Sequence, residues 1–326
     1  MSKASFVIPV YNSSVYLRGC IDSIMRQDCQ DFDIYCIDDC SQDDCRMIIE
    51  EYASEYPDRI HGLFNEKNLG QGRSRMRGVE ASDSDYILFV DSDDYLAEDY
   101  LSTFLKEVEH GPLDIVVAGF TKDIDGEYVE HDIVQNDWTL VTYPVACCKM
   151  YRRAFIQENH IDFSNVRKGE DIYFSIAAFC CSPRVKFIQY FGYYYRLNSS
   201  STTESMNADS KHEEAVSRMF HQLMDKFDVA KLDQERYQMV EYAYIANMVN
   251  ALITYDHGCR PRAMREKYLF FQNDLALLFP DWRKNPYYRY WRFDGPNNKI
   301  KLGVCVTMNL MKCHMAWGIY WLLSWI

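Results

Sequence analysis

Short apolar segments alternate with longer segments of helical periodicity through the first hundred residues. From their lengths and spacing we expect strands at 4–10, 32–38, 60–64 and 86–90, and helices near 15–25, 42–55 and 72–82. Strands that alternate with helices of this length are typical of βαβ units and a parallel sheet. Ligands of such sheets bind beyond the carboxyl ends of the strands. The pattern therefore predicts an α/β fold with a ligand site at that edge.

The pattern changes after residue 110. We expect a strand at 114–120, an irregular strand at 138–150, helices at 151–158 and 170–181, a strand at 185–191, and mostly helix over 208–277. The polar stretch 197–209, "LNSSSTTESMNAD", is the clearest loop. We therefore predict two domains, an α/β domain over 1–205 and a helical region over 206–326.

Composition narrows the class of protein. Of the 326 residues, 48% are apolar and 25% are charged, as in an ordinary globular enzyme. The net charge of −13 disfavours binding to nucleic acid phosphates. Twelve cysteines without a Cys-x-x-Cys pair do not support a zinc ribbon or a thioredoxin-type site. With no apolar signal core at the N-terminus, we expect a cytoplasmic protein with free thiols.

The stretch "LFVDSDDYL" carries the first candidate site. Asp91 and Asp93 flank Ser92 directly after the strand expected at 86–90. Strand alternation would place both carboxylates on one side, where they could share a hard divalent cation such as Mg²⁺ or Mn²⁺. Such a cation commonly takes substrate phosphates as further ligands. The alternative is a solvated turn in which Asp94 caps a helix near 97–107.

Three further groups have both a functional and a structural interpretation. Asp38 and Asp39 lie at the end of the strand expected at 32–38, where a carboxylate could accept a hydrogen bond from a nucleobase or a ribose, or could belong to a polar turn. Three arginines, Arg73, Arg75 and Arg77, follow the "GQG" turn; one of them could neutralise a phosphate, or they could lie on a solvated helix face. Glu170 and Asp171 begin an expected helix, where the dipole stabilises a carboxylate and where one could act as a general base.

Taken together, these stretches resemble the family-2 glycosyltransferases of the GT-A fold, a Rossmann-like, mostly parallel sheet flanked by helices. The likeness covers about 4–203 and rests on "SFVIPVYNSSVYLRGCIDSIMRQ", "DFDIYCIDDCSQDD", "NLGQGRSRMRG", "YILFVDSDD", "GEDIYF" and "YYYRLNSSST". The downstream blocks are similar to bacterial capsule- and exopolysaccharide-type members. The chain departs from the family pattern at Cys40, where glycine is usual, and at Ser74 and Met76.

The resemblance implies an inverting, Mn²⁺- or Mg²⁺-dependent transfer of a sugar from a nucleotide diphosphate donor, here a UDP-sugar, to an acceptor hydroxyl. It implies that Asp93 is the main metal ligand, with Asp91 contacting ribose or metal, and that Asp171 is the base, with Glu170 beside it. The nucleotide-sugar site would be formed by Pro9, Tyr11, Asp39, Arg75, Asp91, Ser92 and Arg196, and Ser201 would help to close it. The implied acceptor is a lipid-linked or polysaccharide-precursor glycan.

The C-terminal residues 303–326 are apolar and aromatic. Asn309, Lys312 and His314 interrupt the run of about 20 apolar residues that a membrane-spanning helix needs. We therefore expect either attachment to the inner face of the cell membrane or burial against the helical region or a partner subunit of a homo-oligomer.

Other classes of protein remain as alternatives. One is a non-catalytic module that binds a nucleotide sugar or a carbohydrate. Another is a Mg²⁺-dependent phosphatase of the haloacid dehalogenase type, but its Asp-x-Asp motif normally lies near the chain start, and here it begins at residue 91.

Overall fold

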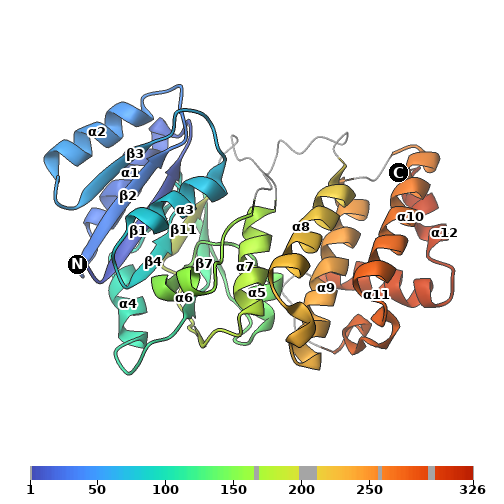
Figure 1. Ribbon diagram of the computed structural model, residues 1–326. Coiled ribbons are helices and arrows are strands. Elements are labelled where there is room, and N and C mark those ends of the chain that lie inside the picture. Colours follow the sequence, from blue (N-terminus) through green and yellow to red (C-terminus); the bar gives the residue numbers. More distant parts are fainter. Residues whose placement is uncertain (1, 165–168, 198–210, 256–258, 293–297, 326) are drawn as a thin grey trace. The chain divides into compact units, whose positions relative to one another are not determined.

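The computed structural model describes residues 2–164, 169–197, 211–255, 259–292 and 298–325 (Figure 1). The chain forms two compact units. The first unit contains Met1–Asn136 and Val145–Asn198, and the second contains Asp137–Pro144 and Ser199–Ile326. The domain boundary predicted between 205 and 206 lies outside the described residues.

A seven-stranded sheet forms the centre of the first unit (Figure 1). Its strands are β1 (Ala4–Val10), β2 (Phe32–Asp38), β3 (Ile60–Phe64), β4 (Tyr86–Phe89), β6 (Ile115–Val117), β9 (Lys149–Arg152) and β10 (Val185–Phe187), in the order β10-β6-β9-β4-β1-β2-β3. Only β9 runs antiparallel to its neighbours among these strands. The predicted α/β fold with a mostly parallel sheet is confirmed.

Helices flank this sheet and connect its parallel strands. They are α1 (Ser14–Met25), α2 (Cys45–Glu55), α3 (Gln71–Ala81), α4 (Tyr100–Glu107), α6 (Arg153–Glu158) and α7 (Glu170–Cys180). All seven residues of β1 are buried. Helix α3 packs on β1 and β2. A Cβ atom at Gly78 of α3 would lie 2.4 Å from Val7 Cγ1, so this glycine permits the close approach of helix and sheet.

A smaller sheet lies beside the main one within the first unit. It contains β5 (Tyr95–Leu96), β7 (Phe120–Ile124), β8 (Glu127–His131) and β11 (Tyr193–Arg196), in the order β5-β11-β7-β8. The single strand expected at 114–120 is therefore wrong, because the chain leaves the main sheet after Val117 and enters the smaller sheet at Phe120.

Three other expected elements differ from the structure. Where we expected an irregular strand at 138–150, the chain forms helix α5 (Trp138–Thr142) and then β9. Because β9 continues to Arg152, the helix expected at 151–158 begins only at Arg153. The indole of Trp138 packs edge-on against Tyr287 and Tyr242, with ring centroids 4.7 and 5.3 Å away. Packing within the second unit thus overrides the strand propensity of "WTLVT". The strand expected at 185–191 ends at Phe187.

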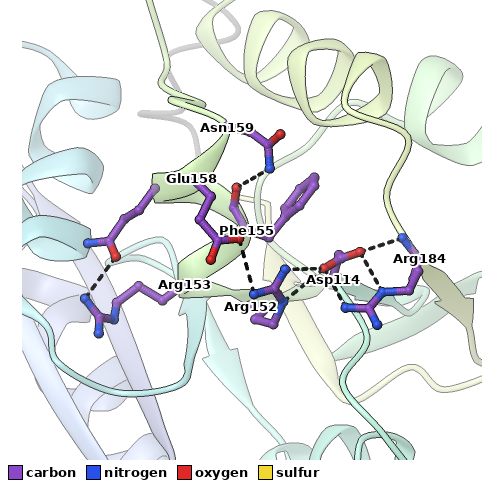
Figure 2. Close-up of polar contacts among 8 residues, drawn as sticks. Asp114, Arg152, Arg153, Phe155, Glu158, Asn159 and Arg184 are labelled. Carbon is purple, nitrogen blue, oxygen red and sulfur yellow. Dashed lines mark hydrogen bonds and ion pairs between the residues drawn. The ribbon is translucent and has the colours of Figure 1, made fainter.

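Figure 2 shows the charged cluster that fixes the edge of the main sheet. The Asp114 carboxylate, which precedes β6, accepts hydrogen bonds from Arg152 Nη2 at 2.7 Å and from Arg184 Nε at 3.1 Å. The backbone N–H of Arg184 also donates to it, at 2.8 Å. Burial alone would raise the pKa of Asp114, but the hydrogen bonds from Arg184 and Arg152 outweigh burial and lower it.

The second unit is helical. It contains α5, α8 (His212–Lys226), η2 (Val229–Lys231), α9 (Gln234–Asn250), the π-helical turn η3 (Ala251–Tyr255), α10 (Pro261–Leu278), the 3₁₀ turns η4 (Trp282–Lys284) and η5 (Pro286–Tyr288), α11 (Asn298–Lys312) and α12 (Trp317–Leu323). Over its described residues, the helical region predicted at 208–277 is confirmed.

The apolar C-terminal residues form parts of α11 and α12. Helix α11 packs on α9 and α12 packs on α10, so Val304, Met308 and Tyr320 are fully buried within the second unit. Trp321 in α12 and Trp325 just after it are exposed. Among the described residues, no helix combines the length and hydropathy needed to cross a bilayer.

Candidate active site

The acidic motif lies in a turn rather than on a strand. Strand β4 ends at Phe89, and the backbone N–H of Asp94 donates to the carbonyl of Asp91 at 3.1 Å. The predicted placement of both carboxylates by strand alternation is therefore wrong, because Asp91 and Asp93 follow the strand. Ser92 is buried and its hydroxyl lies 2.7 Å from that of Ser13 at the start of α1. The turn is thereby fixed to the neighbouring helix.

Asp94 has a different role from the expected helix cap. Helix α4 begins only at Tyr100, and the carboxylate of Asp94 instead accepts hydrogen bonds from Tyr193 Oη at 2.7 Å and from the backbone N–H of Arg196 at 2.9 Å. Its side chain is almost fully buried. Burial, together with the charges of Asp91 and Asp93, raises its pKa well above the usual range. Asp94 therefore attaches strand β11 to the acidic motif.

A buried arginine supplies the positive charge among these carboxylates. The Arg75 side chain is 0% exposed, and its Nη2 lies 2.7 Å from Asp91 Oδ1. Its Nη1 lies 2.5 Å from Asp171 Oδ1, and the guanidinium carbon lies 5.3 Å from the ring centre of Phe163. One side chain thus joins the acidic motif to the start of α7, 96 residues along the chain.

Local chain geometry explains why Arg75 reaches both carboxylates. Gly70, with φ of 92°, precedes α3, a backbone conformation that favours glycine. A Cβ atom at Gly72 would lie 2.6 Å from Phe163 Cβ and 3.4 Å from Glu170 Cβ. The first turn of α3 is therefore packed directly against the residues around the start of α7.

Glu170 and Asp171 occupy the first turn of α7, as predicted. Burial raises the pKa of Asp171, and the charge of Asp91 adds to this effect while Arg75 opposes it. Burial and the charge of Asp171 raise the pKa of Glu170 to about 7. Carboxylates with raised pKa values are suited to general acid–base work near neutral pH.

Lys149 is a neighbour of this cluster that sequence reasoning missed. It lies on β9, is fully buried, and its ammonium donates a hydrogen bond to the carbonyl of Val145. Burial lowers its pKa to about 8, although the charge of Asp171 acts in the opposite direction. A single lysine in a strand-like segment gives no sequence signal of burial, so only the packing reveals it.

Asp39 organises the loop that leads into α3. Its two carboxylate oxygens accept hydrogen bonds from Asn65 Nδ2 at 2.7 Å and from the backbone N–H groups of Leu69 and Gly70, both at 2.8 Å. Cys40 follows with φ of 66°, in the left-handed region, which explains why glycine is usual at this position of the motif. A carboxylate has about four acceptor sites, so the expected contact with a base is still compatible with this geometry.

The other predicted site residues lie in or directly after strands β1 and β11. Pro9 is buried in β1, and Tyr11, just after this strand, is 50% exposed. The guanidinium of Arg196 lies 5.1 Å from the ring centre of Tyr16 and 5.0 Å from that of Tyr95. Ser201 lies outside the described residues.

The carboxylates of Asp91 and Asp93 suit a hard cation whose remaining ligands come from water or substrate. Within the described parts of the chain, no three His, Cys, Asp or Glu side chains are grouped to hold a metal ion. Asp91 and Asp93 offer carboxylate oxygens from one turn, and Arg75 already engages Asp91 Oδ1. Two carboxylates with waters and substrate phosphates are a common ligand set for Mg²⁺.

Comparison with known proteins gives one family. Residues 5–160 match the family model described as glycosyl transferase family 2. The chain is 30% identical over 219 residues to the uncharacterized glycosyltransferase EpsJ of Bacillus subtilis, covering 61% of this chain and 62% of that protein. It is 27% identical over 205 residues to the poly(ribitol-phosphate) beta-N-acetylglucosaminyltransferase TarS of Staphylococcus aureus, covering 60% of this chain and 35% of that one. It thus spans about three fifths of EpsJ and about a third of TarS.

Solved structures show the same fold. A fragment of S. aureus TarS crystallised with UDP-GlcNAc is similar with a TM-score of 0.65 and 18% identity, covering 90% of this chain and 95% of that one. The mannosyltransferase PcManGT from Pyrobaculum calidifontis, crystallised with GDP-Man and Mn²⁺, is similar with a TM-score of 0.54 and 13% identity, covering 95% and 88%. Residues 5–160 thus match glycosyltransferase family 2, and the chain has the GT-A fold of these solved structures.

Proposed function

We propose that this chain is a metal-dependent, inverting glycosyltransferase that moves a sugar from a UDP-sugar to an acceptor hydroxyl. The observation that carries the proposal is the bridge from Asp91 through the buried Arg75 to Asp171. This bridge joins a carboxylate motif suited to a metal and a diphosphate to a carboxylate suited to act as a base. The TarS and PcManGT structures, which contain UDP-GlcNAc and GDP-Man with Mn²⁺, support a nucleotide-sugar donor.

In the proposed reaction, Asp171 accepts the proton of the acceptor hydroxyl as this oxygen attacks the anomeric carbon. The bond from that carbon to the diphosphate breaks on the opposite face, so the configuration inverts. A Mn²⁺ or Mg²⁺ ion held by Asp93 and Asp91 would stabilise the charge that develops on the diphosphate. The chain itself contributes the placement of both substrates relative to Asp171.

Arg75 fits a positioning role within this scheme. Its side chain is buried and both terminal nitrogens already bind carboxylates, so we propose that it fixes the separation of Asp91 and Asp171. The contact with the donor diphosphate that the family resemblance implies for Arg75 stays a prediction.

For the acceptor we propose a lipid-linked or polysaccharide-precursor glycan. TarS acts, by its name, on poly(ribitol-phosphate). The exposed Trp321, Leu322 and Trp325 on and after α12 support contact with the inner membrane surface, because tryptophan favours the membrane–water interface. The same exposed side chains would suit the contact of a homo-oligomer.

A screen of nucleotide sugars tests the proposal. With Mn²⁺ present, a bound donor should raise the melting temperature, and an added acceptor should cause release of nucleoside diphosphate. Asp93→Ala should lower metal-dependent release by at least about a hundredfold. The matched control is Asp85→Ala, which removes a carboxylate that is 67% exposed and should leave the rate unchanged.

Two results would contradict the proposal. Stabilisation by a donor without any release of diphosphate across a wide set of acceptors would indicate a binding module. Release of inorganic phosphate from a simple ester, abolished by Asp93→Ala, would indicate a phosphatase.

A further inference from the structure

The region from Arg283 to Trp325 is basic within an acidic chain. It contains seven Lys or Arg residues and a single acidic residue, Asp294, although the net charge of the chain is −13. The proposed glycosyl transfer uses none of these seven residues. The positive charge of this region therefore has no role in the proposed transfer.

Buried side chains hold the start of this region in place. Trp282 is 4% exposed and Tyr288 is 1% exposed, so the turns η4 and η5 are anchored in the unit. Asn285 between them donates to the carbonyl of Gln238 at 2.8 Å. Arg283 and Arg289, which follow the two anchors directly, are exposed. Because each buried aromatic residue is followed directly by an exposed arginine, both guanidinium groups lie at the surface.

Five of the seven cations line one cavity of about 430 Å³. The polar and charged residues around it include Arg283, Lys284, Arg289, Arg292, Asn309 and Lys312. A volume of this size is within the usual range for small-ligand sites, about 300–1,000 Å³. The cavity lies entirely within the second unit and contains no residue of the acidic motif.

The positive charge of this cavity is only partly neutralised. Lys284 pairs with Asp281 at 2.8 Å. The other four cations form no ion pair within the described ranges. Lys312 is half-buried with its ammonium 5.2 Å from the ring centre of Tyr288.

A second carboxylate next to the lining residues Asn285 and Tyr288 is already engaged. Glu241 is buried and accepts hydrogen bonds from the hydroxyl of Tyr288 and from Asn285 Nδ2. Burial and the neighbouring Arg289 lower the pKa of Lys312, while Glu241 acts in the opposite direction. Like charges are therefore held close together here, which is the arrangement that an incoming anion would stabilise.

We propose that this cavity binds a phosphate- or diphosphate-bearing group, separately from the nucleotide-sugar donor. Arginine binds phosphate oxygens in a bidentate manner, and lysine and asparagine add single donors. A compact group with two or more negative charges matches a cavity with three arginines and two lysines. The group could come from a free phosphorylated ligand or from the headgroup of an anionic lipid, which share this chemistry.

Calorimetry with inorganic pyrophosphate tests the proposal on the full chain. EDTA is present, so that metal-dependent binding at the acidic motif does not contribute. The double variant Arg289→Ala/Arg292→Ala removes two exposed arginines and should weaken binding at least tenfold. The double variant Arg262→Ala/Arg265→Ala removes the same charge from α10, away from the cavity, and should change the affinity less than twofold.

A second arm distinguishes the two sources of the group. Vesicles containing phosphatidylglycerol and vesicles of phosphatidylcholine alone are compared by flotation with the same variants. If pyrophosphate binds and the Arg289/Arg292 variant loses it, the cavity takes a free phosphorylated ligand. If only the anionic vesicles bind, and this variant again loses the binding, the cavity takes a lipid headgroup.

Two outcomes would overturn the proposal. One is that neither pyrophosphate nor anionic vesicles bind the unmodified chain. The other is that both pairs of arginines have equal effects, which would show a general response to net charge. Circular dichroism of both variants confirms that the helices are intact, so that a loss of binding is not a loss of folding.

Discussion

Two charged clusters of the first unit have opposite compositions. At Asp114, one carboxylate binds two arginines, and its pKa is lowered (Figure 2). At Arg75, one arginine binds two carboxylates, and the pKa values of Asp171 and of the adjacent Glu170 are raised. An excess of cations keeps a carboxylate ionised and stabilises the fold. An excess of carboxylates leaves a place for a proton or a metal ion, which is what the proposed chemistry needs.

The largest expected effect is on transfer at the carboxylate-rich cluster. Asp171→Asn should lower the rate by about 10²–10⁴-fold, because an amide cannot accept the proton of the acceptor. The amide oxygen can still accept from Arg75, so donor binding should persist. The measurement compares single-turnover transfer with donor-induced thermal stabilisation. An unchanged transfer rate would remove Asp171 as the base.

The next largest expected effect is on the stability that the Arg75 cluster gives to the fold. Arg75→Met should lower the free energy of unfolding by about 3 kcal/mol, because two carboxylates lose their shared partner. The side chains of Asp91 and Asp171 are 27% and 32% exposed, so hydration limits the loss of free energy of unfolding. Urea denaturation measures it, with Arg73→Met, an exposed position of the same helix, as the control. Equal effects of the two substitutions would show that the bridge has no special part in the fold.

Substitution in the cation-rich cluster around Asp114 should change the stability of the chain and not its activity. Asp114→Asn should cost about 2 kcal/mol with the transfer rate retained, because both arginines lose their charged acceptor. Glu158→Gln, which alters a carboxylate 3.7 Å from Arg152 and 66% exposed, should cost less than about 0.5 kcal/mol. The difference between the unmodified chain and Asp114→Asn should shrink as the pH falls through the lowered pKa of Asp114, because protonation removes the carboxylate charge that the variant already lacks. A constant difference down to pH 2 would contradict this account.

The smallest effect is a pH dependence at Glu170. Its pKa is raised from 4.5 to about 7, so the folded chain retains a proton that the unfolded chain releases between these values. The free energy of unfolding should therefore fall as the pH rises from 4.5 to about 7, by on the order of 1 kcal/mol, because partial exposure of Glu170 to water reduces the full effect of this shift. Glu170→Gln should reduce this slope, as measured by denaturation across the range, while Asp171, whose pKa is also raised, still contributes. A parallel slope in both proteins would place the raised pKa elsewhere.

The parts of the fold with strong local patterns could be predicted from the sequence. The strands at 4–10 and 32–38 coincide with β1 and β2, because burial on both faces produces largely apolar runs, and the strand at 60–64 coincides with β3 at the edge of the sheet. Helix α5 could not be predicted, because its residues favour a strand locally and become helical through packing on Tyr242 and Tyr287.

The candidate site could be predicted as a set of residues but not as a geometry. The ordered motifs identified Asp91, Asp93 and Asp171. They did not reveal that Arg75 would join two of them, or that Asp94 would turn towards Tyr193, which is 99 residues away. Sequence spacing contains no information about such contacts until the sheet order is known.

The hydroxyl of Tyr193 determines how the acidic turn would respond to substitutions in β11. This one oxygen donates to Asp94 and accepts from the backbone N–H of Asp91, at 2.7 and 3.2 Å. The acidic turn therefore takes its shape from a tyrosine contributed by the far end of the first unit's sequence. A substitution of Tyr193 should therefore change the positions of Asp91 and Asp94, and with them the carboxylates that we propose to hold the metal ion.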